Sequence, residues 1–324
     1  MYVNQTMIDY FIIKGISDDP DLQLPIFLVV LLIYLITLSG NIIILVACRD
    51  PQLHTPMYFF LGNLSIVDIS CTTVSQHKIL TNFITGNKVV SFFACMAQMY
   101  MFGSLQILEL VILTAMSYDR YVAICKPLHY HTIMNPKTCV LLAAFCWCFA
   151  FLEVLPPFRV VYSFSCYTTN EINHFFCDVV PLTQISCNDT RLVETLFFIE
   201  ALCPMMFTPF LFTFGSYVFI IASIIKIHSS SGRHKAFYTC SSHLTVVVLL
   251  YTTLFSQYLT PNVGKNSGAK KVFALFNTAA VPMLNPLIYS LKNKDVKAAL
   301  MRHKGKSKTG FYSFFKVYKA FCFE

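Results

Sequence analysis

Long apolar runs alternate with short polar segments along most of the chain. Seven runs reach the length of about 20 residues that a helix needs to cross a bilayer. This alternation predicts an all-α membrane protein, a seven-transmembrane helix bundle whose termini lie on opposite faces of the membrane. The predicted spans lie near residues 24–48, 57–80, 93–119, 139–158, 194–226, 237–260 and 270–291.

The composition agrees with a bilayer as the main solvent. The 324 residues are 56% hydrophobic and only 12% charged, whereas a soluble domain is about 25% charged. Residues 1–23 are polar and acidic and have neither the basic segment nor the cleavage site of a signal peptide. We therefore expect a short flexible arm before the first span, and that span should act as an uncleaved anchor.

The distribution of positive charge orients the predicted bundle. Sixteen Lys and Arg residues fall on the face that carries the C-terminal tail, and eight fall on the other face. The positive-inside rule then places the N-terminus outside and the tail in the cytosol. Most of the positive residues behind the net charge of +8 lie on this predicted cytosolic face. Their location explains the charge without a nucleic-acid partner. The glycosylation sequons at Asn4 and Asn188 also fall outside.

Four of the thirteen cysteines fall on the predicted outer face, where disulfides persist. They allow three pairings, and the residues alone do not choose among them. The four are Cys95, Cys166, Cys177 and Cys187.

Two carboxylates lie inside predicted spans at one depth. Asp68 is about 16 Å into the second span, and Glu109 is about 15 Å from the inner end of the third, at 1.5 Å per residue. Unpaired charges at this depth are costly. Either repulsion and burial keep a proton on the pair, or a cation lies between the two groups.

Four strings have the wording and the order of a known family. The third span ends in MSYDRYVAIC (116–125), which holds Asp119, Arg120 and Tyr121. The others are PQLHTPMYFFLGNLS (51–65), RHKAFYTCSSHL (233–244) and PMLNPLIYS (282–290). Together they resemble the odorant receptors, a branch of the rhodopsin-like G-protein-coupled receptors, and most closely the tetrapod-type class.

The resemblance implies roles for many of these residues. Cys95 would pair with Cys177 and Cys166 with Cys187, while Asp68 and Glu109 would bind an allosteric sodium ion; no other cofactor is implied. Asp119, Arg120 and Tyr121 would form the switch for G-protein coupling. Asn285, Pro286 and Tyr289 would form a hinge in the seventh helix, with Asn285 bonding the carbonyl that Pro286 frees.

The resemblance also divides the chain and places the protein. It implies an extracellular arm (1–23), a seven-span receptor domain (24–291), a short amphipathic eighth helix (292–303) and a cytosolic tail (304–324). Leu291, just before this helix, and Val296 and Leu300 within it would face lipid. The receptor would lie in the plasma membrane, in sensory cilia, and would bind a small volatile odorant and a heterotrimeric G protein that raises cyclic AMP.

An odorant pocket is expected above the sodium level, between the third, fifth, sixth and seventh helices. It would be mostly apolar, as suits a small apolar ligand. No acid stands in the outer half of the third helix, which disfavours an amine ligand. The candidates are Phe102, Gly103, Gln106, Ile107, Tyr251, Leu254, Phe255, Tyr258, Leu275 and Thr278.

Three other functions are open to a membrane protein with seven spans. A transporter or channel needs a continuous polar path, but the mid-membrane acids lie only in the inner half. An intramembrane enzyme needs a paired catalytic motif, such as HExxH, that the sequence does not contain. A non-olfactory rhodopsin-like receptor would share the fold. The sequence therefore favours a receptor that is not an enzyme.

Overall fold

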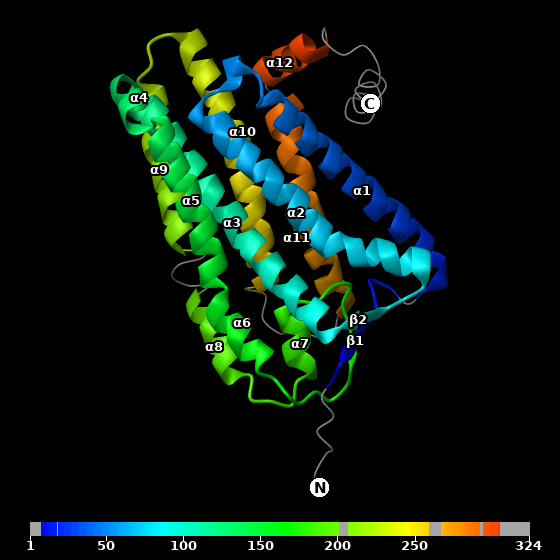
Figure 1. The fold of residues 1–324 in the computed structure, drawn as a ribbon. Coiled ribbons are helices and arrows are strands. Elements are labelled where there is room, and N and C mark those ends of the chain that lie inside the picture. The colour runs from blue at the N-terminus through cyan, green and yellow to red at the C-terminus, as the bar shows by residue number, and fades with distance from the viewer. Residues whose placement is uncertain (1–7, 18, 201–206, 259–266, 292–293, 305–324) are drawn as a thin grey trace.

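A computed structural model describes residues 8–17, 19–200, 207–258, 267–291 and 294–304. Within them, seven helical segments are long and apolar enough to cross a membrane, as the sequence predicts (Figure 1). The helices that form these segments are α1 (Pro20–Ala47), α2 (Pro56–Thr85), α3 (Phe92–Cys125), α5 (Pro136–Glu153) with α6 (Leu155–Tyr162), α9 (Thr208–Ile225), α10 (Ser230–Tyr258) and α11 (Ser267–Pro286).

Shorter elements join or extend these helices. On the side of α12 they are η1 (Pro51–Leu53), η2 (Pro127–His129), α4 (Tyr130–Ile133), the π-helical turn η4 (Leu287–Leu291) and α12 (Lys294–Lys304). At the opposite end they are β1 (Tyr10–Ile13), β2 (Val89–Ser91), β3 (Glu171–Ile172), α7 (Val179–Ile185) and α8 (Arg191–Glu200).

Local residue chemistry sets several helix ends. Pro20 occupies the first turn of α1, where its missing N–H costs nothing, and the Asp19 side chain accepts a hydrogen bond from the N–H of Asp21. Asn135 caps α5 in the same way through the N–H of Thr138. Gly86 ends α2 with a φ of 68°, a left-handed conformation that glycine adopts without strain.

The burial pattern fits a bundle in lipid. Leu64, Leu108 and Ile112 are fully buried between helices, whereas Phe212 and Phe219 on α9 are more than 60% exposed. Large apolar side chains on the outside have no favourable partner in water, but a bilayer covers them. The exposed aromatic surface of α9 is therefore its lipid face.

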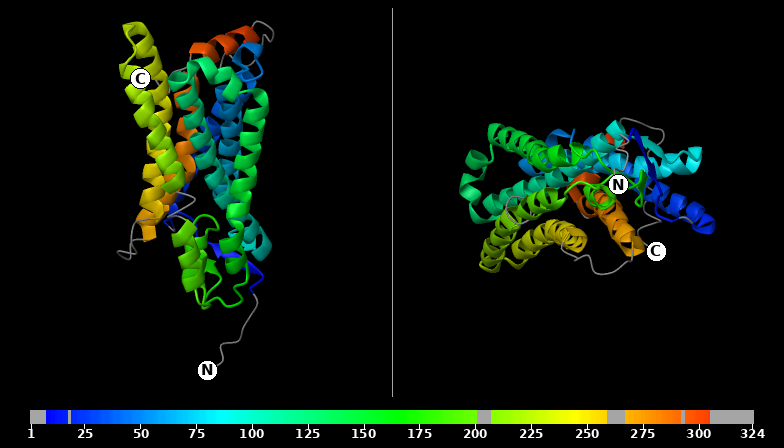
Figure 2. Two further views of the ribbon diagram at one scale, coloured as in Figure 1. Left: turned by 90° about the vertical axis from the view of Figure 1, so that its left-hand side faces the viewer. Right: turned by 90° about the horizontal axis from the view of Figure 1, so that it is seen from below.

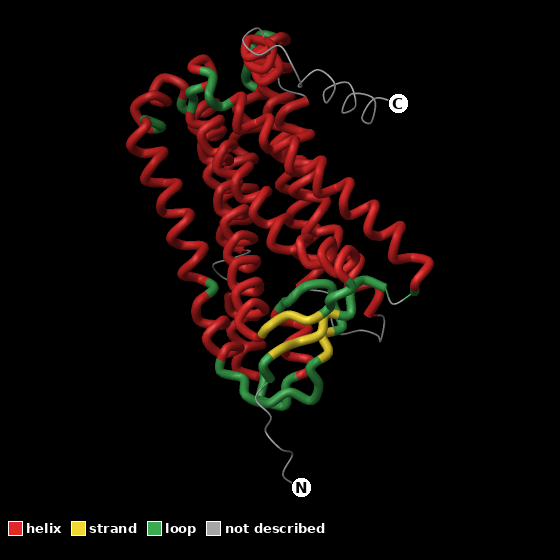
Figure 3. Tube along the Cα trace, turned by 45° about the vertical axis from the view of Figure 1, so that its right-hand side comes forward, coloured by secondary structure: helices red, strands yellow, loops and turns green. Residues whose placement is uncertain are grey.

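The N-terminal arm is more ordered than the sequence predicts. Its strand β1 pairs antiparallel with β2 and parallel with β3, and this small sheet lies at the end of the bundle that carries the N-terminus (Figure 3). Phe11 and Ile13 of β1 are fully buried. The expectation of a flexible arm is wrong for residues 10–13, because pairing with two distant segments leaves no periodic signal. In addition, α1 begins at Pro20, four residues earlier than predicted.

Residues 201–206 of the predicted fifth span lie outside the described residues, between α8 and α9. One other expectation needs correction. The eighth helix, α12, lies across the end of the bundle (Figure 2). Val296 and Leu300 are at most 4% exposed and pack into the bundle core instead of facing lipid. The side chain of Leu291 lies outside the described residues.

Candidate functional site

A buried polar cluster joins three helices at mid-bundle. The Nδ2 of Asn285 on α11 donates hydrogen bonds to Asp68 Oδ1 of α2 at 3.0 Å and to Glu109 Oε1 of α3 at 3.1 Å. Asp68 and Asn285 are at most 1% exposed and Glu109 is 2% exposed. The two acids predicted to lie at one depth are therefore close together in the structure. Asn285 is the residue that joins them.

The cluster has the chemistry of a small cation site. Two carboxyl groups meet around one neutral amide, and the described residues contain no salt bridge to either acid. The Oδ1 atoms of Asn285 and of Asn41 are buried without a hydrogen-bond partner among those residues. Carboxylate and amide oxygens are ligands that hard cations prefer. The donor set therefore fits a sodium ion, and a shared proton is the alternative.

The expected hinge is built differently from the sequence interpretation. Pro286 has no N–H for the Pro282 carbonyl one turn earlier, and the Nδ2 of Asn41 on α1 reaches that oxygen at 3.4 Å. Asn285 does not serve it, because its amide is committed to the carboxylates. Directly after Pro286 the helix widens into the π-helical turn η4, which holds Tyr289. Such turns are frequent at functional sites.

At the inner end of α3, Asp119 is held from two sides. Its Oδ2 lies 3.4 Å from Arg120 Nη2, and its Oδ1 accepts a 2.8 Å hydrogen bond from the hydroxyl of Tyr130 on α4. Arg120 also contacts the Met57 sulfur on α2. Asp119 is fully buried. Because a buried carboxyl group without partners costs free energy, both contacts stabilise it in this position. The sequence interpretation paired Asp119 with Arg120 but missed Tyr130.

A second polar group lies between the inner halves of α9, α10 and α11. The hydroxyl of Tyr217 and Nδ1 of His243 share a 2.7 Å hydrogen bond, and the Tyr289 ring lies 6.5 Å from the His243 ring. Tyr121 packs nearby, with its ring 6.1 Å from that of Phe219. The Tyr217–His243 hydrogen bond thus joins α9 to α10, and a shift of α10 against α9 would break it.

Part of the predicted ligand set gathers in an aromatic group. Tyr251 and Phe255 of α10 lie with their ring centres 5.3 and 6.3 Å from that of Phe210 on α9. Phe214 completes the group, 6.1 Å from Tyr251. The Tyr251 hydroxyl is buried and has no partner among the described residues. Phe210 and Phe214 were missed because all faces of α9 are apolar, so its sequence does not mark the inner one.

The candidates on α3 face different neighbours. Phe102 is buried under Phe176 of the outer loop, with ring centres 4.7 Å apart. Gln106 and Ile107 are also buried. Gly103 faces the end of α5, and not α9, α10 or α11. A Cβ atom at this position would lie 3.5 Å from the Val154 side chain.

The remaining candidates lie on α10 and α11. Leu254 is buried and Leu275 is half-buried. Thr278 is fully buried and its hydroxyl donates to the Leu275 carbonyl at 3.3 Å. The side chain of Tyr258 lies outside the described set. The sequence does not indicate one further contact between these two helices. The Thr253 hydroxyl of α10 donates a hydrogen bond to Asn277 Oδ1 of α11 at 2.9 Å.

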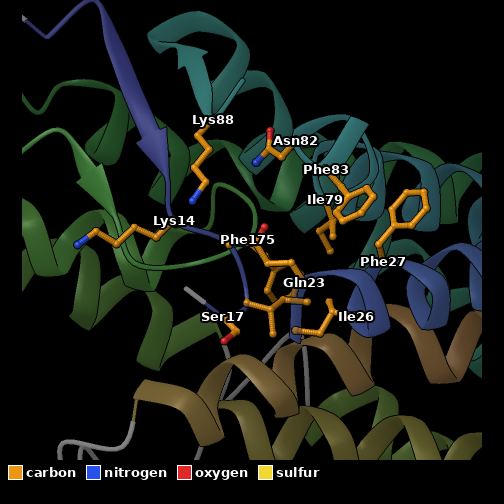
Figure 4. A pocket seen from close by; sticks show the side chains of 12 residues that line it. Lys14, Ser17, Gln23, Ile26, Phe27, Ile79, Asn82, Phe83, Lys88 and Phe175 are labelled. Atoms are coloured by element: carbon orange, nitrogen blue, oxygen red, sulfur yellow. The ribbon is translucent and has the colours of Figure 1, made fainter. Parts of the chain in front are cut away.

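A cavity lies elsewhere, at the outer ends of α1 and α2 (Figure 4). None of the ten ligand candidates is among the described residues that line it. The rings of the aromatic group between α9 and α10 lie against one another. The predicted odorant pocket therefore rests on the position of its residues.

The outer loop carries both disulfides that the resemblance implies. Cys95 at the start of α3 is joined to Cys177, and Cys166 to Cys187, each with a Cα–Cα separation of 5.3 Å. Asn188 lies beside the second bridge, where its Oδ1 accepts from the Cys166 N–H at 3.0 Å. Asn4 lies outside the described residues.

Known proteins resemble this chain over nearly its whole length. A family model described as "Olfactory receptor" matches residues 30–305. The chain belongs to the olfactory receptor family. It is 46% identical to human "Olfactory receptor 6C3", with 92% of this chain and 96% of that protein covered. It is 44% identical to mouse "Olfactory receptor 5AR1", with 94% and 98% covered.

The fold has a solved counterpart. The crystal structure of squid rhodopsin superposes with a TM-score of 0.71 and 18% identity, covering 88% of this chain and 82% of that one. The chain therefore has the rhodopsin-like fold. It is a multi-pass membrane protein and an odorant receptor of the G-protein-coupled class, not an enzyme.

Proposed function

We propose that this olfactory receptor binds a small, volatile, mostly apolar odorant in the outer half of its helix bundle. The observation that carries the proposal is the aromatic group of Phe210, Phe214, Tyr251 and Phe255. Its rings offer apolar contact, and the Tyr251 hydroxyl offers one buried hydrogen bond. No charged residue lies between Phe92 and Leu108 on α3, which agrees with a neutral ligand.

The signal would pass to the inner face through the polar contacts below this group. Odorant binding would move α10 against α9 and α11, which strains the Tyr217–His243 contact. Release of Arg120 from Asp119 would then open a cleft for a stimulatory-type G protein that raises cyclic AMP. The plasma membrane, in sensory cilia, is the proposed location, with glycans on Asn4 and Asn188.

A sodium ion at Asp68 and Glu109 would be a negative modulator. The ion would offset the repulsion between the carboxylates and stabilise the resting contacts of α2, α3 and α11 through Asn285. Activation would compress the site, so sodium would bind the resting state better and oppose agonists. A carboxyl pair that shares a proton predicts pH dependence without a response to sodium.

An odorant panel tested on cells with a cyclic-AMP reporter examines the ligand proposal. Neutral apolar odorants should activate the receptor, and Tyr251→Phe should weaken those that carry a hydroxyl or carbonyl group. Val248→Ala is a control on the same helix, at a side chain that is 44% exposed. A receptor that responds only to amines or other ions would contradict the proposal.

A further inference from the structure

The cavity in Figure 4 has polar chemistry on one side and apolar chemistry on the other. It lies between the N-terminal arm, α1, α2 and the outer loop, and it is partly open to the surroundings. Lys88 and Asn82 lie on one side, and Phe27, Phe83 and Ile79 lie together on the other. Such a division matches a ligand with a polar head and an apolar tail.

The head side is positive and has room for a partner. Lys14 also lines the cavity, but its ammonium pairs with Glu171 at 2.8 Å and points away in Figure 4. No described acid lines the cavity or pairs with Lys88. A carboxylate head could form an ion pair with the Lys88 ammonium and accept a hydrogen bond from the Nδ2 of Asn82, which lines the same cavity.

The tail side continues toward the membrane. Phe27 of α1 stacks on Phe83 of α2 with ring centres 4.2 Å apart, and Phe83 is 40% exposed. Leu24 and Leu28 on the same helix as Phe27 are more than 50% exposed. The apolar side of the cavity is thus continuous with exposed apolar surface that the outer leaflet covers. The apolar chain of a ligand can lie along this surface.

We propose that this cavity binds a single-chain anionic amphiphile, such as a fatty carboxylate, from the outer leaflet. Its carboxylate lies at Lys88 and Asn82, and its chain follows Ile26, Phe27 and Ile79. The site is separate from the odorant pocket and does not depend on it.

Occupancy would brace the outer end of the bundle. Gly15 of the arm lines the cavity, its N–H donates to the His174 carbonyl at 3.0 Å, and its carbonyl accepts from Lys271 Nζ of α11 at 2.9 Å. A ligand against Gly15 therefore contacts the segment that ties the outer loop to α11. Binding should raise the melting temperature of the receptor.

The test is direct binding of tritiated decanoate to the full-length receptor in nanodiscs of zwitterionic phosphatidylcholine. Binding should be saturable and should weaken about tenfold or more in Lys88→Gln. It should be retained in Lys88→Arg and in Arg159→Gln, which removes an exposed charge at the outer end of α6. Ile26→Phe should weaken binding by filling the tail path, with the charge unchanged.

Three results would overturn the proposal. Decanoate could bind equally well to Lys88→Gln and Ile26→Phe, which denies both halves of the site. Decanol could bind as tightly as decanoate, which denies the role of charge. Phosphatidylglycerol in the nanodisc could displace decanoate from the unmutated receptor and leave decanoate binding to Lys88→Gln unchanged. This result would assign the site to a phospholipid instead. Melting temperatures of all variants without ligand show that each one is folded.

Discussion

Tyr130 should hold the receptor in its resting state through one hydrogen bond. Its hydroxyl donates to Asp119 Oδ1 at 2.8 Å, and the acceptor is fully buried. A hydrogen bond to a charged group contributes about 1.5–3 kcal/mol. If the bond breaks on activation, Tyr130→Phe removes about that much from the resting state alone. Each 1.4 kcal/mol changes the equilibrium about tenfold.

Basal signalling is the quantity to measure. In cells with a cyclic-AMP reporter, Tyr130→Phe should raise agonist-free output about tenfold at equal surface expression, so long as the active fraction is small. Tyr118→Phe is the matched control, since this tyrosine is 44% exposed and on the same helix as Asp119. Unchanged basal output in Tyr130→Phe, or an equal rise in Tyr118→Phe, would refute the reasoning.

Three more predictions follow from the structure. Asn285→Ala should abolish the sodium dependence of agonist potency, measured by exchanging sodium for choline in membranes. If this exchange does not change agonist potency in the unmutated receptor, the sodium site is wrong. Burial, with nearby Lys271 as a second cause, lowers the pKa of His174 to about 4, so its neutral form is favoured in the folded loop. Stability should therefore fall as pH drops from about 6.5 toward 4, and the melting temperature of His174→Gln should fall less over that range. Peptide mapping without reduction should recover Cys166 joined to Cys187, and a Cys95–Cys166 peptide would contradict both bridges.

The helices were predictable because they follow from local sequence. Apolar runs of bilayer length gave seven spans, and proline or a capping side chain marks starts such as Pro56 and Pro136. Depth counted at 1.5 Å per residue was enough to pair Asp68 with Glu109. These features need only the chain itself and the thickness of a membrane.

Contacts between distant segments were not predictable in the same way. The contact between Trp147 and Asn63 is an example, because nothing in the sequence around either residue indicates the other. In the structure Trp147 Nε1 donates to Asn63 Oδ1 at 3.1 Å and joins α5 to α2. The pairing of β1 with residues 89–91 and 171–172 likewise depends on how three loops meet. Periodicity carries no information on either contact.

Side-chain direction on α3 and α11 also required the fold. Gly103 is at the depth of the pocket but faces Val154. Asn285 was expected to serve the carbonyl freed by Pro286, but it bridges two acids while Asn41 serves that carbonyl. A depth estimate does not fix rotation about a helix axis, so residues at the right level can face the wrong way.

The central claim is that an odorant in the bundle activates a G protein through Arg120. Its most direct test is odorant-stimulated binding of a non-hydrolysable GTP analogue to a stimulatory heterotrimer in membranes. The unmutated receptor and Arg49→Ala, which removes an exposed arginine on the same face, should show stimulation. Arg120→Ala should show none at equal surface expression, and undiminished stimulation in Arg120→Ala would contradict the account.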